Sequence, residues 1–317
     1  MYRRIAVALD TSPEARYALR WAVTIARRAN CPLEVVRVAV PALHDSNLYA
    51  AAVLSDADVE RLVREAEHDL RDVADEAASE GVRATPVVLQ GEVSSTLADH
   101  LHDSDVDLAV MTTHDRGRLE RLLLGSVSDT VMRHAHIPVL LVRAPRTDVV
   151  ADVELTLRRI LVPFDGSAFA EQILAPAMTL ATLMSADLTL LSVVEPILGS
   201  AALATGINGT PNPAFASRLA EAEDDEERVA VESQTLDRTA ERIRSKGVAV
   251  DIRVLIDARP AHSIVAFASH NAIDLIAMTT HGRGALKRLV AGSVAEGVLH
   301  ATTAHMLLYR PENPEPS

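Results

Sequence analysis

Short apolar runs alternate with longer amphipathic stretches along this chain. Residues 4–9 are almost continuously apolar and end at Asp10, and residues 33–40 are short and rich in β-branched side chains. Between them, residues 15–29 carry apolar side chains at intervals of three and four. A run of the first kind predicts a buried strand, and the spacing of the second kind predicts a helix with one apolar face.

The same alternation continues through residue 142. A polar-periodic segment from about Ser55 to Glu80 predicts a helix, because Gly81 directly after it is the residue that favours a helix C-terminus. Further strands are predicted at 82–89, 107–111 and 137–142, and further helices at 94–101 and from Ser126 onward. Apolar strands that alternate with helices indicate a parallel sheet covered by helices on both faces.

The second half of the chain repeats this order from Arg159 to Tyr309. Asp10 and Asp165 end the first strand of each half and are 155 residues apart. Long-range self-similarity of this kind predicts two copies of one domain, which we place at residues 1–146 and 156–313. The fold class is therefore α/β, with two tandem copies of a mostly parallel sheet flanked by helices.

The offset between the copies changes along the chain. It is 155 residues at Val38 and Val193 but 167 at Gly125 and Gly292. Twelve additional residues must therefore lie between the second and fourth strands of copy two. Segment 199–217 is rich in Gly, Ala, Asn and Pro, which predicts a loop. A solvated surface loop and a flap over the second site both remain open as interpretations.

The last strand of each copy, at 137–142 and 306–309, is apolar. A bare apolar edge invites pairing with another strand. If the two strands pair within the chain, the copies form a pseudo-symmetric unit, and we expect two such units to assemble as a homodimer.

Charge and composition exclude several classes of function. The chain has 317 residues and a formal net charge of −13, with no tract of five or more Lys and Arg, so a nucleic-acid partner is not expected. The single cysteine, Cys31, excludes an intramolecular disulfide and thiolate metal sites. No apolar stretch approaches the roughly 20 residues of a membrane helix. We expect a cytoplasmic protein with no membrane partner.

A polar loop and a Gly-Ser pair follow the fourth strand of each copy. The loop runs from Met111 to the pair at Gly125 and Ser126, and again from Met278 to the pair at Gly292 and Ser293. A helix N-terminus offers unpaired N–H groups and partial positive charge, and glycine allows close backbone approach, so the arrangement suits a phosphate group. In copy two, Arg283 and Lys287 add positive charge. The alternative is a simple strand-to-helix turn with serine as N-cap.

An aspartate follows the first strand of each copy. In open parallel sheets, ligands bind outside the carboxyl ends of the strands where the strand order reverses, which brings the first and fourth loops together. Asp10 and Asp165 can therefore accept hydrogen bonds from ribose hydroxyls. The alternative role for each is an N-cap of the following helix.

Taken together, these residues resemble the universal stress protein family of the tandem type. Its ATP-binding members carry the pattern G-x2-G-x9-G-[S/T] after the fourth strand and an aspartate after the first, and the similarity spans nearly the whole chain. The resemblance implies two tandem doubly wound domains of five mostly parallel strands each, with the adenine-nucleotide alpha-hydrolase-like fold. It also implies binding of ATP with Mg²⁺ and a regulatory role in stress response that involves an unknown protein partner.

The resemblance also implies which residues border the nucleotide. In copy two they are Pro163, Phe164, Asp165, Val193, Met278, Thr279, His281, Gly282, Arg283, Gly292, Ser293, Val294 and Ala295. In copy one the matching positions are Ala8, Leu9, Asp10, Val38, Met111, Thr112, His114, Asp115, Gly125, Ser126, Val127 and Ser128. By the same resemblance, the aspartate meets the ribose, the second-strand valine borders the adenine, and the Gly-Ser segment cradles the phosphates.

The two copies depart from the family pattern to different degrees. Both have threonine, Thr112 and Thr279, at the first glycine of the pattern, and copy one also has Asp115 at the second, where copy two has Gly282. At an intermediate dielectric, like charges ~4 Å apart repel by about 4 kcal/mol before screening. We therefore expect copy two to bind ATP more tightly than copy one.

Other functions stay open at this stage. No catalytic residues are predicted, so we expect at most slow ATP hydrolysis or self-phosphorylation. A nucleotide-independent dimerisation or scaffold module is the main alternative, and an adenylating enzyme is a third, which would need a second ligand pocket. His134, His136, His300 and His305 are interpreted as surface or interface residues. Trp21 is expected in the core or in a partly buried position, and no metal site is predicted.

Overall fold

A computed structural model describes residues 1–39, 56–113, 126–144, 155–196, 213–280 and 293–311. The first half contains β1 (Ile5–Ala8), α1 (Ala15–Ala29), β2 (Leu33–Val38), α2 (Asp56–Ser79), β3 (Ala84–Leu89), α3 (Val93–Asp103), β4 (Leu108–Thr112), α4 (Ser126–His134) and β5 (Val139–Val142). The second half contains β6 (Arg159–Pro163), α5 (Ala168–Glu171), α6 (Leu174–Met184), β7 (Asp187–Val194), α7 (Pro213–Arg244), β8 (Val250–Ile256), α8 (Pro260–His270), β9 (Leu275–Thr279), α9 (Ser293–Ala301) and β10 (His305–Tyr309).

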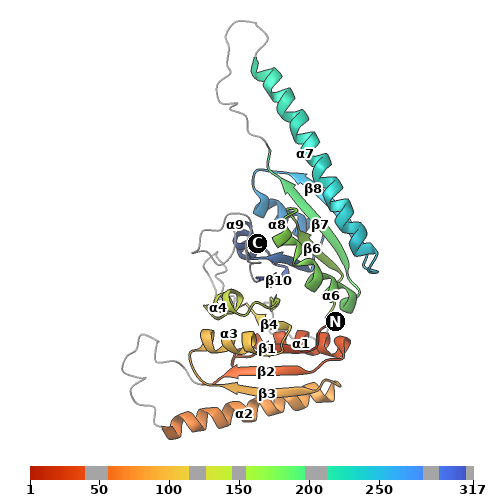
Figure 1. Ribbon diagram of the computed structural model, residues 1–317. Coiled ribbons are helices and arrows are strands. Elements are labelled where there is room, and N and C mark those ends of the chain that lie inside the picture. Colours follow the sequence, from red (N-terminus) through yellow and green to blue (C-terminus); the bar gives the residue numbers. More distant parts are fainter. Residues whose placement is uncertain (40–55, 114–125, 145–154, 197–212, 281–292, 312–317) are drawn as a thin grey trace, which may run out of the picture.

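All ten strands form one continuous sheet in the order β3-β2-β1-β4-β5-β10-β9-β6-β7-β8. Strands pair in parallel within each half, and the two halves join where β5 pairs with β10 in antiparallel orientation. Figure 1 shows β3 with α2 at one end of the molecule and β8 with α7 at the other. The predicted α/β fold of two doubly wound, mostly parallel copies is confirmed.

The junction between the halves has near two-fold symmetry. Leu140 of β5 pairs with Leu307 of β10, and these two leucines occupy equivalent positions in the two copies. On either side, Leu141 pairs with Met306 and Val139 with Leu308. The pseudo-two-fold axis therefore passes through the Leu140 and Leu307 pair, and the expected pairing of the last strands within the chain is confirmed.

Helices cover the sheet in two layers because side chains alternate along each strand. In β1, Ile5 and Val7 pack in the layer that also contains Trp21 of α1, while Ala6 packs on the other face with Leu97 of α3. The first layer takes in α1, α2, α6 and α7, and the second takes in α3, α4, α8 and α9. Trp21 is 2% exposed, so the expectation that it belongs to the core is confirmed.

Equivalent hydrogen bonds tie the strands together in both copies. The carboxylate of Asp107, before β4, accepts from the backbone N–H groups of Arg3 and Arg4, at 2.8 and 3.3 Å. Asp274, before β9, accepts from those of Arg158 and Arg159 at 2.7 and 2.9 Å. Each aspartate thus fixes the start of the fourth strand of its copy beside the start of the first.

Two arginines also connect the halves. Arg143, after β5, donates from Nη2 to the carbonyl of Leu299 (2.8 Å) and from Nε to that of Ala304 (3.0 Å). Arg310, its equivalent after β10, donates to the carbonyl of Arg133 at 3.0 Å. Each guanidinium lies at the C-terminal end of the other copy's last helix, where carbonyls lack partners within the helix and positive charge is favourable.

The structure corrects the predicted loop at 199–217. Helix α7 begins at Pro213, so residues 213–217 are helical, while residues 199–212 lie outside the described residues. Proline is favoured in the first turn of a helix because its missing N–H would have no partner there. The strand pairing also locates the twelve additional residues of copy two. Leu33 pairs with Ala84 in copy one, and Leu188 pairs with Val250 in copy two, so the offset between equivalent residues is already 166 at the start of β8. Eleven of the additional residues therefore lie before β8, and one lies after its start.

Copy two also differs from the prediction after β6. Where copy one has the single helix α1, copy two has the short α5 and then α6. Pro176 lies in the first turn of α6 and has no N–H to donate to the carbonyl of Gln172, so a continuous helix across this point would lose a hydrogen bond. Ser167 caps α5 by accepting from the N–H of Ala170 at 3.0 Å.

Candidate functional site

The strand order reverses between β1 and β4 in copy one and between β6 and β9 in copy two. Each pair is hydrogen-bonded in parallel, with Ile5 opposite Leu108 and Ile160 opposite Leu275. The carboxyl ends of the two strands therefore lie side by side, and in open α/β sheets this is where ligands bind. The two sets of predicted site residues lie at these two places.

In copy two, Asp165 directly follows the end of β6. Its Oδ1 accepts a 3.0 Å hydrogen bond from the N–H of Ser167, which fixes the carboxylate over its own loop. Phe164 before it is 5% exposed and donates its N–H to the carbonyl of Leu191 on β7 at 2.8 Å. Asp165 is exposed, so its carboxylate is available to solvent or ligand. The N-cap of the helix is Ser167, and the alternative role for Asp165 as that cap is wrong.

The neighbouring strand β9 brings Met278 and Thr279 to the same edge of the sheet. Met278 is 7% exposed and Thr279 is partly exposed. Helix α9 begins at Ser293, which is exposed, and its next residues, Val294 and Ala295, turn towards the sheet. The predicted ribose wall and the helix that was predicted to cradle phosphates thus belong to adjacent elements.

Apolar site residues of copy two share one face of the sheet. Val193 of β7, Met278 of β9 and Val294 of α9 pack in or against the layer formed by α8 and α9. Val193 and Val294 remain partly exposed, unlike the deep core. A partly exposed apolar surface beside a carboxylate and a helix N-terminus suits a planar base that carries a sugar and phosphates. Pro163 ends β6 next to this surface.

Copy one repeats the arrangement. Ala8, Val38 and Val127 are partly exposed against the same layer, and Asp10 follows β1 with its Oδ1 accepting from the N–H of Ser12 at 2.9 Å. Four further predicted residues are buried: Leu9 (8%), Met111 (5%), Thr112 (9%) and Ser128 (5%). Ser126 is the first residue of α4.

Seven predicted site residues lie outside the described residues: His114, Asp115, Gly125, His281, Gly282, Arg283 and Gly292. These residues form most of the expected phosphate loops. The expected roles of the glycine pattern, and the effect of Asp115, therefore remain predictions.

A buried charge cluster distinguishes copy one from copy two. Glu34 of β2 is 7% exposed and accepts hydrogen bonds from Arg4 Nη1 at 2.6 Å and from the ring Nε2 of His100 on α3, at 3.0 Å. The His100 hydrogen bond, together with Arg4, holds the pKa of Glu34 below its usual value despite burial. At the equivalent positions, copy two has Thr189 and Phe267. The cluster connects β1, β2 and α3 and lies at the amino end of the strands, away from the candidate site.

Comparison with known proteins decides the family. The model of the universal stress protein family matches residues 1–143 and again 156–310. This chain belongs to the universal stress protein family. Its two copies are two tandem domains of that family, as their pseudo-symmetry in the structure also indicates.

Similar proteins match either one copy or nearly the whole chain. A universal stress protein of Staphylococcus aureus strain USA300 is 33% identical over 145 residues, which are 45% of this chain and 84% of the relative. A universal stress protein from Archaeoglobus fulgidus DSM 4304 is 18% identical, covers 98% of this chain and 97% of its own, and has a TM-score of 0.66. A functionally unknown protein from Pseudomonas aeruginosa PAO1 also has a TM-score of 0.66, at 16% identity, covering 98% and 93%. These structural similarities show that the two solved structures share the fold of this chain.

The sequence analysis missed the serines that orient the two aspartates. Ser12 and Ser167 donate their N–H groups to Asp10 and Asp165, and the sequence Asp-x-Ser at the end of the first strand is present in both copies. An aspartate that accepts from the N–H two residues later is a known turn signal. Within the described part of the chain, no group of three or more His, Cys, Asp or Glu is arranged to bind a metal, and no helix there is long and apolar enough to span a membrane.

Proposed function

We propose that this universal stress protein binds ATP at the carboxyl ends of β6 and β9, and that nucleotide occupancy changes its contacts with a protein partner during a cytoplasmic stress response. The observation that supports this most is that three groups lie around the same point of the sheet. The exposed carboxylate of Asp165, the partly exposed apolar side chain of Val193 and the N-terminus of α9 all border the strand-order reversal of copy two.

Each group matches one part of the nucleotide. A carboxylate accepts from ribose hydroxyls, an apolar surface packs against the base, and helix N–H groups favour phosphate oxygens. Magnesium prefers oxygen ligands and keeps several waters, so phosphate oxygens of the nucleotide would provide its main ligands here. The described acidic residues form no cluster of three that would hold it without the nucleotide.

The two sites are proposed to differ in affinity. Copy one has Asp115 where copy two has Gly282, and a carboxylate close to the phosphates opposes binding. Each ~1.4 kcal/mol of repulsion weakens affinity tenfold, so site one binds much more weakly unless Mg²⁺ bridges the charges.

Isothermal titration calorimetry with Mg-ATP tests this proposal in matched variants. Gly282→Asp is expected to abolish the tighter binding event, and Asp115→Gly to strengthen the weaker one. Asp165→Asn should weaken the tight event, whereas Asp10→Asn, its counterpart in copy one, should leave it unchanged. Unaltered stoichiometry and affinity in all four variants would refute the proposal.

A nucleotide-independent scaffold is the competing function. It predicts no nucleotide in protein purified after mild lysis and no thermal shift under millimolar Mg-ATP. Light scattering with and without nucleotide also tests the proposed homodimer of tandem units, since β3 and β8 are the edge strands of the sheet that the described residues form.

A further inference from the structure

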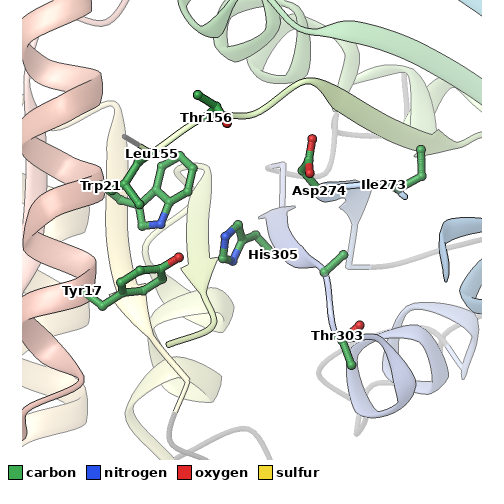
Figure 2. Close-up of a pocket in the computed structure, with 9 residues that line it drawn as sticks. Tyr17, Trp21, Leu155, Thr156, Ile273, Asp274, Thr303 and His305 are labelled. Carbon is green, nitrogen blue, oxygen red and sulfur yellow. The ribbon is translucent and has the colours of Figure 1, made fainter. Parts of the chain in front are cut away.

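A cavity with a volume of about 400 Å³ lies between the two halves of the chain. Figure 2 shows side chains of α1 on one side of it and residues around the starts of β9 and β10 on the other. Its polar or aromatic lining residues are Tyr17, Trp21, Thr156, Asp274, Thr303 and His305. Cavities of roughly 300–1,000 Å³ are typical for small-molecule sites.

This cavity is separate from the candidate nucleotide site of copy two. Asp274 immediately precedes β9, and His305 is the first residue of β10. Met278 and Thr279, which border the nucleotide site, lie at the other end of β9. The cavity therefore lies at the amino end of β9, and the candidate nucleotide site lies at its carboxyl end.

Three aromatic rings form one wall of the cavity. The ring centroids of Trp21 and His305 are 5.1 Å apart, and those of Tyr17 and Trp21 are 6.5 Å apart, both in edge-to-face arrangement. Trp21 is 2% exposed, and its Nε1 has no hydrogen-bond partner within the described residues. Figure 2 shows the nitrogen edge of the indole turned towards Tyr17 and His305. The nitrogen is buried from solvent, so an occupant of the cavity would contact the aromatic rings of this wall and not the indole N–H.

His305 contributes a neutral ring to the same wall. Its Nδ1 accepts a 3.1 Å hydrogen bond from the backbone N–H of Arg143. Burial, and next the charge of Arg143, lower the pKa of His305 to about 4, so the ring is neutral near pH 7. With Nδ1 as acceptor, the proton of the neutral ring resides on Nε2.

The opposite wall carries negative charge. Asp274 is the charged side chain among the lining residues that the structure describes, and its Oδ2 is fixed by the N–H groups of Arg158 and Arg159. Figure 2 shows Asp274 and Thr303 across the cavity from Tyr17, Trp21 and His305. Aromatic faces with a carboxylate opposite favour an organic cation and disfavour an anion.

We propose that this cavity binds a small aromatic amine. Its ring packs against Tyr17 and Trp21, and its ammonium group pairs with Asp274. The cavity is built from both copies, so an occupant would also contact the junction between them.

The chain provides its own reporter, because Trp21 is its single tryptophan. Tyramine is the probe, added to the full chain while Trp21 emission is recorded at excitation wavelengths that phenols do not absorb. We expect a saturable change with tyramine, a weaker one with the neutral analogue 4-ethylphenol, and none with the anion 4-hydroxyphenylacetate.

Asp274→Asn keeps a carbonyl oxygen to accept from the backbone but removes the charge. It is expected to weaken tyramine binding by about tenfold or more, as for a lost charge-assisted hydrogen bond. The matched control is Asp107→Asn, which alters the equivalent clamp in copy one at a residue that does not line the cavity. Its tyramine affinity should remain within about twofold of the parent.

Three results would overturn the proposal. One is the absence of a saturable signal with tyramine by fluorescence and by calorimetry. Another is equal weakening by Asp107→Asn and Asp274→Asn, which would indicate a general loss of structure. The third is competition between tyramine and Mg-ATP, which would place the probe in a nucleotide site. Failure of ATP binding alone leaves this cavity unaffected, so the two proposals are tested separately.

Discussion

Acidification is expected to destabilise this protein through His305 at the junction of the two halves. Burial is the main cause that lowers the pKa of His305 from 6.5 to about 4, the positive charge of Arg143 contributes, and Asp274 opposes the shift. The unfolded chain therefore takes up this proton below about pH 6.5, whereas the folded chain takes it up only near pH 4. The contribution of neutral His305 to the free energy of unfolding is fully present above pH 6.5 and is lost as the pH falls towards 4.

The size of the effect follows from the same values. One pKa unit corresponds to about 1.4 kcal/mol, so the full shift sets an upper limit of about 3 kcal/mol at pH 4. The side chain of His305 remains partly exposed at the cavity. Water screens part of the cost at such a position, and we expect a loss of about 1–2 kcal/mol.

Urea unfolding of the full chain at about pH 7 and about pH 4.5 measures this loss when the parent is compared with His305→Asn. The asparagine oxygen lies near the position of Nδ1 and can still accept from Arg143, but it does not titrate. Other groups contribute equally to both proteins, so the parent should lose about 1–2 kcal/mol more than the variant. The exposed His262→Asn is the control. Equal losses in the parent and in His305→Asn would show that His305 does not carry this dependence.

Three further predictions concern packing and the junction. Leu307→Ala, at a fully buried position on the pseudo-two-fold axis, should cost about 2–5 kcal/mol in urea unfolding, and a cost below 1 kcal/mol would mean that the junction repacks. Arg143→Met removes two hydrogen bonds to carbonyls of copy two and should lower the free energy of unfolding by about 1–3 kcal/mol. Arg310→Met removes one such hydrogen bond to copy one and should cost less. A larger loss in Arg310→Met by chemical denaturation would contradict this. Gly297→Ala places a methyl group 2.8 Å from the Cβ of Ala261 between α8 and α9, so it should lower stability by about 1–3 kcal/mol in thermal unfolding. Ala261→Gly in the same chain should restore most of that loss, and no restoration would locate the strain elsewhere.

Local pattern was sufficient to predict most of the elements. The apolar spacing in residues 15–29 coincides with α1, and the polar-periodic segment that ends before Gly81 corresponds to α2. Gly81 has φ +84°, the conformation expected of glycine after a helix. These elements follow from side-chain periodicity and chain-terminating residues, which are local properties. The internal repeat then fixed the domain count, and the apolar last strands predicted the pairing of the halves.

Features that depend on long-range side-chain contacts were not predicted. The start of α7 at Pro213 was missed because a composition rich in Gly, Ala, Asn and Pro resembles a loop until the helix after it is known. Glu34 lies in a strand whose alternation gave no sign that His100, 66 residues away, would be its partner. Similarly, the burial of Trp21 was predicted, but its edge-to-face contact with His305, from the far end of the chain, was not.

The two copies share their backbone framework but not the chemistry around it. Asp107 and Asp274 make the same clamp, and Asn30 and Ser185 both end helices with positive φ, at 50° and 56°. A clamp of this kind is needed in each copy, since it sets the register between the first and fourth strands.

The side chains that line the junction cavity have no such repeat. The positions equivalent to Trp21 and His305 are Pro176 and Pro138 in the other copy, and neither proline offers an aromatic ring or an N–H. A pseudo-two-fold axis relates the backbones on both sides of Leu140 and Leu307, yet the aromatic wall is built on one side only. The junction packs without these rings on the other side, where the two prolines occupy the equivalent positions. Packing of the junction alone therefore does not require Trp21 and His305. The asymmetry therefore supports a ligand, and not the fold, as the reason for an aromatic wall across a cavity from a carboxylate.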